Sequence, residues 1–340
     1  MRLHGSMQTK TVTYRNVLSW DDATCLAYLE RKRWPDGQVC PHCGIIETPY
    51  KITRKSKTKN KIRTVYRCKS CKRQFSVTVG TIFEGSHIPL AIWFASIFDM
   101  CASKKGISAH QIHRKYGITY KSALFLCHRI RNAMRNGVFD GQLKGTVEAD
   151  ATFIGGKLRR GHPVMYERID DEIDLGLRTK DGTPKVHGLK GRRHPRTMKT
   201  PVLGILERGG NVRTVALQGK DENATEIRPL LEENIDPNAR LITDGHAAYR
   251  TIERKMRKHD VINHEEAYVR GDVHTQNIEG YWSLVKRGVY GTFHHISRHR
   301  TPMYLGEFEF RFNHRDQSDA DRFQSLLSQT QGRLRWNFRQ

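Results

Sequence analysis

The stretch that organises this chain reads Val147-Glu148-Ala149-Asp150-Ala151-Thr152-Phe153-Ile154-Gly155-Gly156. Its apolar and β-branched residues predict a strand that carries Asp150 and ends at a glycine pair. Two further acids lie in segments of their own: Asp244 ends the apolar run that begins at Leu241, and Glu279 lies in a segment that predicts a helix. Three carboxylates on separate elements suit a two-metal phosphoryl-transfer site, because oxygen ligands suit Mg²⁺ and two ions can bind the attacking and leaving oxygens.

The segments around these acids alternate between strands and helices. Strands are predicted at 146–154, 202–207 and 212–217, a helix at 224–235, and a strand at 240–243. Three strands with a hairpin, a helix, a strand ending in Asp and an acid on a late helix form the RNase H-like order. We therefore predict the α/β class, with an RNase H-like mixed-sheet catalytic domain at residues 145–316.

The charge of the chain predicts a polyanionic partner. Lys and Arg number 59 against 35 Asp and Glu, a formal net charge of +24, and neutralising phosphates releases counterions that drive binding. Charge alone leaves a basic scaffold protein open as an alternative. Residues 157–199 add a long basic stretch without apolar periodicity, which predicts either a DNA-contacting insertion or a disordered excursion.

Four of the seven cysteines are paired as two C-x2-C knuckles, Cys40 with Cys43 and Cys68 with Cys71. Two knuckles offer four thiolates, which is what a closed tetrahedral zinc site requires. We predict a zinc ribbon at residues 37–80 with one structural Zn²⁺. A redox C-x-x-C is the alternative, and two matched pairs in one small basic segment argue against it.

Helices are predicted on either side of the ribbon. Residues 1–36 predict an N-terminal helical segment, and 88–136 a helix-turn-helix domain in which a glycine turn separates a short helix from a longer one. The second helix of such a motif can enter the major groove of DNA, and a plain helical hairpin with a solvated basic face is the alternative. The candidate DNA contacts on this helix are Lys121, Arg129, Arg131 and Arg135. Residues 317–340 are expected to form a C-terminal tail.

No apolar run approaches the roughly 18 residues that a membrane span needs, and the N-terminus lacks the apolar core of a secretory signal. We therefore expect no membrane partner and a cytoplasmic protein associated with the bacterial nucleoid. A reducing compartment also argues against a disulfide framework.

The residues around the three acids resemble those of bacterial insertion-sequence transposases of the DDE type, in the Merlin-related (ISXO-type) group. The resemblance covers residues 17 to 316, and the segments that carry it are Glu148-Ala149-Asp150-Ala151-Thr152-Phe153-Ile154-Gly155-Gly156-Lys157, Thr243-Asp244-Gly245-His246-Ala247-Ala248-Tyr249, His274-Thr275-Gln276-Asn277-Ile278-Glu279-Gly280-Tyr281-Trp282-Ser283-Leu284-Val285-Lys286-Arg287-Gly288, 291–297 and 307–313. It implies an N-terminal zinc ribbon and an RNase H-like domain. It also implies two Mg²⁺ (or Mn²⁺) ions per active site, held by Asp150, Asp244 and Glu279.

The chain departs from the family pattern at Ala151, where relatives often have Glu, and in lacking a Trp near His246. Some relatives use Asn as the third catalytic residue, which makes Asn277 an alternative to Glu279. Glu279 is favoured because Lys286 lies two helical turns further on, so both side chains share one helix face. Lys286, followed by Arg287, could then bind substrate phosphate beside the metals.

The resemblance implies a transposase that binds the terminal inverted repeats of its element, cleaves DNA strands and joins the 3′-OH ends to target DNA. Because two ends must meet, we expect a homodimer or larger assembly on DNA. Two alternatives from other classes stay open. A domesticated zinc-ribbon regulator would bind DNA without catalysis, and the three acids count against it. An RNase H-like nuclease would share the acids and need neither the ribbon nor the helix-turn-helix.

Overall fold

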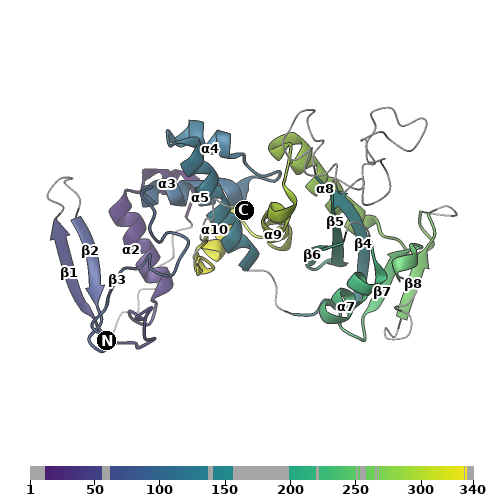
Figure 1. Ribbon diagram of the computed structural model, residues 1–340, viewed down its shortest axis with the longest axis horizontal. Helices are drawn as coiled ribbons and strands as arrows, with labels where there is room; N and C mark the ends of the chain where they lie inside the picture. Colours follow the sequence, from purple (N-terminus) through teal and green to yellow (C-terminus); the bar gives the residue numbers. More distant parts are fainter. Residues whose placement is uncertain are drawn as a thin grey trace, which may run out of the picture. The chain divides into compact units, whose positions relative to one another are not determined.

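The computed structural model describes residues 12–55, 62–136, 141–155, 199–219, 222–249, 258–264 and 268–332, together with 252, 266 and 334. The chain forms two compact units, whose elements Figure 1 labels. Unit 1 comprises Met1–Val138 and His314–Gln340, and unit 2 comprises Phe139–Asn313. The basic insertion expected at 157–199 lies outside the described residues, except for Lys199.

Unit 1 combines a three-stranded antiparallel sheet with helices. The sheet has the order β1-β2-β3. Its strands and the helices of this unit are β1 (Tyr50–Lys55), β2 (Ile62–Arg67), β3 (Gln74–Phe75), α1 (Tyr14–Ser19), α2 (Asp22–Arg33), α3 (Leu90–Ala102), α4 (Ala109–Tyr116), α5 (Tyr120–Asn136) and α10 (Asp319–Ser328).

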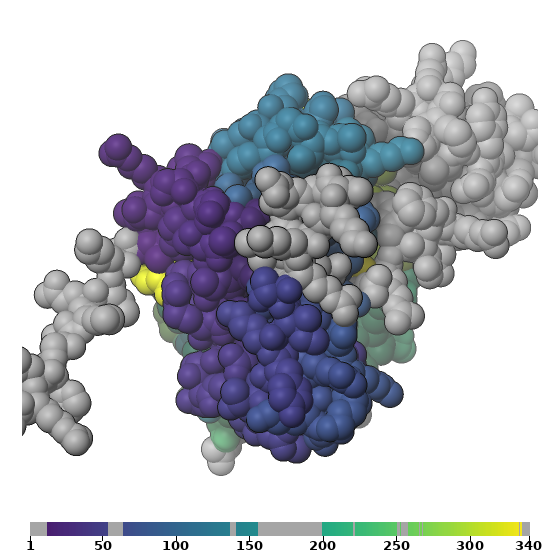
Figure 2. All heavy atoms as spheres, turned by 90° about the vertical axis from the view of Figure 1, so that its left-hand side faces the viewer, coloured from purple at the N-terminus to yellow at the C-terminus, as the bar shows by residue number. Residues whose placement is uncertain are grey.

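Aromatic side chains join the small sheet to α2. The ring of Trp34 lies 5.6 Å from that of Tyr66 and 5.9 Å from that of Phe75, and the Tyr66 hydroxyl donates to Glu30 Oε1 at 2.9 Å. Figure 2 shows this part of the surface, with the ribbon residues in indigo and blue packed against the purple N-terminal helices. The ribbon therefore has apolar support beyond its own few strand residues.

Helix α10 (Asp319–Ser328) lies within the segment 317–340 that was expected to form a C-terminal tail. Ser318 caps its first turn by accepting from the backbone N–H of Asp321. The buried ring of Phe323 lies 5.8 Å from Phe94 and 5.4 Å from Phe98, so this C-terminal helix is part of the core of unit 1. An amphipathic helix of this length needs such a surface to pack against.

Unit 2 contains a five-stranded mixed sheet with the strand order β6-β5-β4-β7-β8. β4 pairs antiparallel with β5 and parallel with β7, which is parallel to β8. This arrangement confirms the RNase H-like fold class predicted from the sequence. The elements are β4 (Thr146–Ile154), β5 (Thr200–Glu207), β6 (Val212–Ala216), α7 (Ala224–Asn234), β7 (Arg240–Asp244), η1 (Ala247–Tyr249), β8 (Lys258–Ile262), α8 (Gln276–Gly288), η3 (Val289–Phe293), η4 (Arg298–Arg300) and α9 (Thr301–Asn313).

Helices lie on both sides of this sheet (Figure 1), and each face carries its own core. Val147 and Ala149 of β4 pack in the cluster that includes α7, whereas Ile154 packs in the cluster that includes α8 and α9. Side chains alternate along a strand, so Glu148 and Asp150 lie on the face that α8 covers. The fold thus turns the first acid toward the helix that carries Glu279.

Candidate functional site

Asp150 and Asp244 are brought together by the parallel pairing of their strands. Ala149 of β4 is in register with Thr243 of β7, so the two acids follow at neighbouring positions on the same face of the sheet. Glu279 lies in the first turn of α8, which covers that face. Asp150 and Glu279 line one open cavity of about 640 Å³.

Burial and neighbouring carboxylates together determine the electrostatics of this site. Burial raises the pKa of Asp150 from 3.8 to about 7, and the nearby carboxylates of Asp244, Glu222 and Glu279 act in the same direction. A concentration of negative charge around a half-buried acid calls for a cation, and carboxylate oxygens are the ligands that Mg²⁺ prefers. The donor set therefore fits the predicted metal.

Glu222 is a fourth acid that sequence reasoning missed. It lies just before the N-cap of α7, with its Oε2 3.5 Å from His246 Nδ1. The backbone N–H of His246 in turn donates to Asp244 Oδ1 at 3.1 Å. No local motif marks Glu222, because only the fold brings the start of α7 to the ends of β4 and β7.

The orientation of Glu279 is set by its own helix and a neighbouring histidine. The buried Thr275 hydroxyl donates to Glu279 Oε1 at 2.8 Å, and His264 Nε2 lies 3.6 Å from the same oxygen. Lys286 and Arg287 line the cavity further along α8, beside Asp150 and Glu279. The side-chain positions thus bring together four of the residues that the sequence nominated for catalysis and phosphate binding.

A buried acid, Glu148, fastens the start of α8 to the sheet. Its Oε2 accepts the backbone N–H groups of Asn277 and Ile278 at 2.9 and 3.0 Å. Its Oε1 accepts from Asn277 Nδ2 and from Arg208 Nε, each at 2.7 Å. Glu148 stands two residues before Asp150 on the same strand face, so this contact fixes the helix of Glu279 relative to Asp150.

Arg208 completes this clamp, which we define as Glu148 and Arg208. Its two terminal nitrogens donate to the carbonyl oxygens of Asp272 and His274, each at 2.8 Å. The segment that leads into α8 is therefore held from both sides. Neither residue was predicted to have a role. The position of Glu148 two residues before Asp150 could have indicated one, because residues i and i+2 of a strand lie on the same face of the sheet.

Asn277, the alternative third ligand, has its side chain engaged in the clamp. Its amide donates to Glu148, and the cavity lining includes Glu279 and not Asn277. This geometry supports Glu279 as the third acid.

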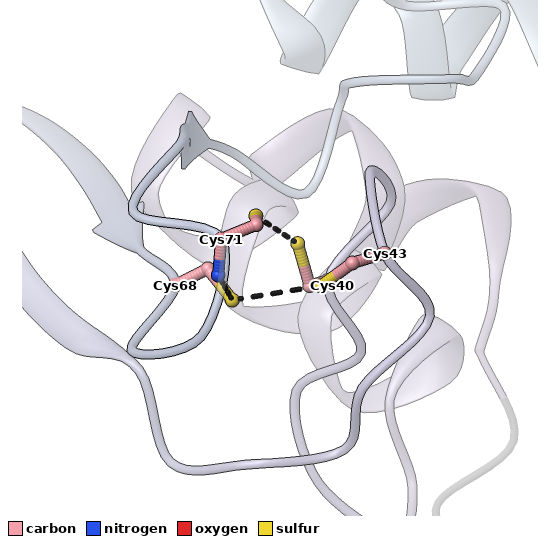
Figure 3. Close-up of side chains that lie close together, drawn as sticks. All are labelled: Cys40, Cys43, Cys68 and Cys71. Atoms are coloured by element: carbon pink, nitrogen blue, oxygen red, sulfur yellow. Dashed lines mark hydrogen bonds between the residues drawn. The ribbon is translucent and has the colours of Figure 1, made fainter.

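The four knuckle cysteines converge in unit 1, as Figure 3 shows. All four sulfur atoms lie within 4.8 Å of one another, with Sγ–Sγ distances of 3.7 Å for Cys40–Cys71 and for Cys43–Cys68. A tetrahedron with Zn–S bonds of about 2.3 Å has edges of about 3.8 Å, so the sulfurs are spaced for Zn²⁺. The backbone N–H of Cys71, pointing at Cys68 Sγ, contributes most to lowering the pKa of Cys68 to about 7.

The helix-turn-helix has the two predicted helices, α4 and α5, separated by Gly117 in the left-handed conformation. Lys121 and Arg135 of α5 are exposed. Arg129 and Arg131 are not, being 3% and 1% exposed.

The burial of Arg129 and Arg131 corrects their assignment as DNA contacts. The terminal nitrogens of Arg129 donate to the carbonyl oxygens of Ile82 and Glu84, at 2.7 and 2.8 Å, and Arg131 donates to that of Ile107 at 3.4 Å. Both guanidinium groups therefore bind backbone within unit 1, where they hold α5 in place.

Among the described residues, no helix combines the length and apolarity needed to cross a bilayer.

Comparison with known proteins links both units to mobile DNA. The profile of the ISXO2-like transposase domain matches residues 142–313, and that of the transposase zinc-ribbon domain matches residues 20–74. The chain is 26% identical over 289 residues to an uncharacterized protein in transposable element ISH50 of Halobacterium salinarum, covering 83% of this chain and 88% of that protein. No solved structure matches the chain.

Proposed function

The chain belongs to the ISXO2-like transposase family, and on this premise we propose that it cuts and joins DNA strands at the ends of its element in a Mg²⁺-dependent reaction. The observation that carries the proposal is the convergence of Asp150, Asp244 and Glu279, together with Lys286 in the lining of the cavity that Asp150 and Glu279 border.

In the first step a water oxygen bonds to the scissile phosphorus and the 3′-oxygen leaves, giving a 3′-OH end and a 5′-phosphate. In the second, that 3′-OH attacks a target phosphodiester and displaces the 3′-oxygen of the target strand. Mg²⁺ held by Asp150, Asp244 and Glu279 would supply charge stabilisation and a bound water of lowered pKa. Lys286 and Arg287 would hold the phosphate in line.

DNA recognition in this proposal belongs to unit 1. The zinc ribbon and the exposed basic residues Lys121 and Arg135 of α5 would bind the terminal inverted repeats, since exposed cations neutralise phosphates and position the protein on the duplex. Joining needs two ends and a target together, so the active form is a homodimer or larger assembly on DNA in the nucleoid.

A strand-transfer assay with Mg²⁺ tests the proposal against its alternatives. The substrate is a duplex that carries the terminal sequence of the encoding element, with a supercoiled plasmid as target. A transposase joins the element end to the plasmid, a nuclease cuts without joining, and a regulator binds without cutting. Binding without any metal-dependent chemistry would overturn the proposal.

A further inference from the structure

One face of α8 leads from the catalytic acids to an exposed aromatic ring. Glu279, Ser283, Lys286, Arg287 and Tyr290 all line the cavity. Glu279, Ser283, Lys286 and Tyr290 follow one another at intervals of three or four residues, which places them on the same side of the helix, and Arg287 is next to Lys286. The order along this face is a carboxylate, a hydroxyl, two cations and a phenol ring. Along this face the carboxylate can bind a metal, the two cations can bind a phosphate, and the phenol ring can bind a base.

The ring projects from an unusual turn. Residues Val289–Phe293 continue α8 as a π-helix, and His294, which closes it, has φ of 60°. Single π turns are frequent at functional sites, and a positive φ outside glycine stores strain that the surroundings must compensate. The turn is fastened by buried Val289 and by Phe293, whose ring lies 4.8 Å from Tyr304.

Tyr290 itself is left outside this packing. Its side chain is 48% exposed. Among the described residues, no aromatic ring packs against the Tyr290 ring and no group forms a hydrogen bond with its hydroxyl. A Cβ added at the adjacent Gly291 would meet nothing within 4 Å, so the space at this next position of the turn is also open. The strained turn thus exposes an aromatic ring that makes no packing contribution to the described fold.

We infer that Tyr290 stacks against an unpaired nucleobase of the substrate strand, within a few nucleotides of the scissile phosphate; this inference rests on the proposed function. Tyr290 lies 11 residues from Glu279, about 16 Å along a helix at about 1.5 Å per residue, which matches a few nucleotides of about 3.4 Å each. A paired base shows a groove only its edge, whereas an unpaired base exposes the face on which an aromatic ring stacks.

The cavity suits this ligand in size and charge. Its volume of about 640 Å³ lies in the range of small-molecule sites, about 300 to 1,000 Å³. Lys286 and Arg287, between the acids and the ring, can neutralise the phosphate that joins the unpaired nucleotide to the scissile position. Base stacking on an aromatic side chain can offset the cost of unpairing one base beside the cut.

The kinetic test compares Tyr290→Leu with Tyr290→Phe on two duplexes that carry the element end. One duplex is fully paired, and the other has non-complementary bases beside the cleavage position. Tyr290→Leu should slow single-turnover cleavage of the paired duplex about tenfold, a typical stacking contribution, and the unpaired duplex should restore most of that loss. Tyr290→Phe, which keeps the ring, should cleave both duplexes at the wild-type rate. Equal rates for the leucine variant and the wild type on the paired duplex would overturn the inference.

A second readout does not depend on cleavage. In an Asp150→Asn background, 2-aminopurine placed in turn at each position beside the cut reports unstacking when the protein binds. One position should respond to the protein with Tyr290 and to the Tyr290→Phe variant, and it should lose its response with Tyr290→Leu. An identical response in all three contradicts the stacking role. If wild-type protein fails to cleave either duplex, the proposed function fails, and the fluorescence still decides whether Tyr290 binds a base.

Discussion

The thiolate cluster of unit 1 and the carboxylate cluster of unit 2 are built in opposite ways. The four cysteine sulfurs lie within 4.8 Å of one another, and in the described part of the chain no other set of three or more potential metal ligands is that close. The acids instead border an open cavity. A closed set of soft ligands holds a metal for structure, whereas an open set of oxygens leaves room for substrate.

The two clusters also differ in what holds them together. The zinc ribbon has few apolar residues, so the structural Zn²⁺ itself supplies folding energy. Burial, and after it the neighbouring carboxylates, raise the pKa of Asp150, and the clamp of Glu148 and Arg208 holds the elements of the acids in place. Removing metal should therefore unfold the zinc ribbon of unit 1 and leave unit 2, which carries the acids, folded.

The largest effect should follow loss of zinc. We expect about one tightly bound zinc per chain. Cys40→Ser should release this zinc, unfold β1–β3 and weaken binding to the element end. The reason is that structural zinc contributes about 10–16 kcal/mol to the folding free energy of small zinc fingers. Metal analysis, far-UV circular dichroism and binding measurements check this. Cys25→Ala, a buried cysteine outside the knuckles, is the control and should keep its zinc. A folded, DNA-binding sample without zinc would show that the ribbon of unit 1 does not depend on zinc for its fold.

Breaking the clamp should have the next largest effect. Glu148→Ala leaves the Arg208 guanidinium and two backbone N–H groups without their acceptor, and breaking a buried pair costs about 3–5 kcal/mol. The melting temperature of unit 2 should fall, and the double variant with Arg208→Ala should lose less than the sum of the single losses.

The partly exposed pair Arg228–Glu232, with its 2.9 Å contact, provides the matched control for the clamp. Glu232→Ala should change stability by less than about 0.5 kcal/mol, as is usual for such pairs on a helix. If Glu148→Ala is equally mild, the clamp does not hold the site.

The crowding of the acids predicts a dependence of stability on pH. The folded-state pKa of Asp150, about 7, lies above its ordinary 3.8, so the unfolded chain ionises first as pH rises. The metal-free protein should lose stability between about pH 4 and pH 7, by up to about 4 kcal/mol at about 1.4 kcal/mol per pKa unit.

Asp150→Asn removes this loss. In the presence of EDTA and at pH 8, the variant should melt several degrees above the wild type, whereas Mg²⁺ should stabilise only the wild type. Equal melting temperatures at pH 8 without metal would mean that the acids do not strain the fold.

Lys286→Ala should have the smallest effect. Its loss should slow cleavage about tenfold and reduce the salt slope of binding by about one counterion, because many other basic residues share nonspecific DNA binding. Lys258→Ala, an exposed lysine of the same unit that does not line the cavity, should leave the cleavage rate unchanged. A lower melting temperature with normal single-turnover cleavage would indicate that Lys286 has only a structural role.

The sequence was most informative where structure is local. Two C-x2-C knuckles predicted the sulfur cluster in full, and the glycine between two amphipathic segments predicted the turn from α4 to α5. Each pattern spans a few residues whose geometry the backbone fixes. The succession of strands and helices along unit 2 was likewise predictable from alternating segments, each with its own periodicity.

Contacts between distant segments could not be predicted in the same way. Glu222 meets the other acids only because α7 begins beside the ends of β4 and β7, and Arg208 reaches the clamp from a hairpin. The burial of Arg131 was within reach, since it lies four residues after Cys127 and three before Met134, both buried. Arg131 was predicted to lie on the exposed face because the basic residues of α5 were considered without their helical spacing from buried residues.

The central claim is that Asp150, Asp244 and Glu279 form one metal-dependent site and that Asn277 does not belong to it. Single-turnover cleavage of the element-end duplex in Mg²⁺, with DNA binding measured on the same samples, tests it most directly. Alanine at each of the three acids should abolish cleavage and leave binding near the wild-type level, because each change removes a contact made in the transition state. Asn277→Ala should retain cleavage within about tenfold, since the Asn277 amide binds Glu148 and one hydrogen bond to a charged group contributes about 1.5–3 kcal/mol. Wild-type cleavage by Glu279→Ala, together with its loss in Asn277→Ala, would contradict the account.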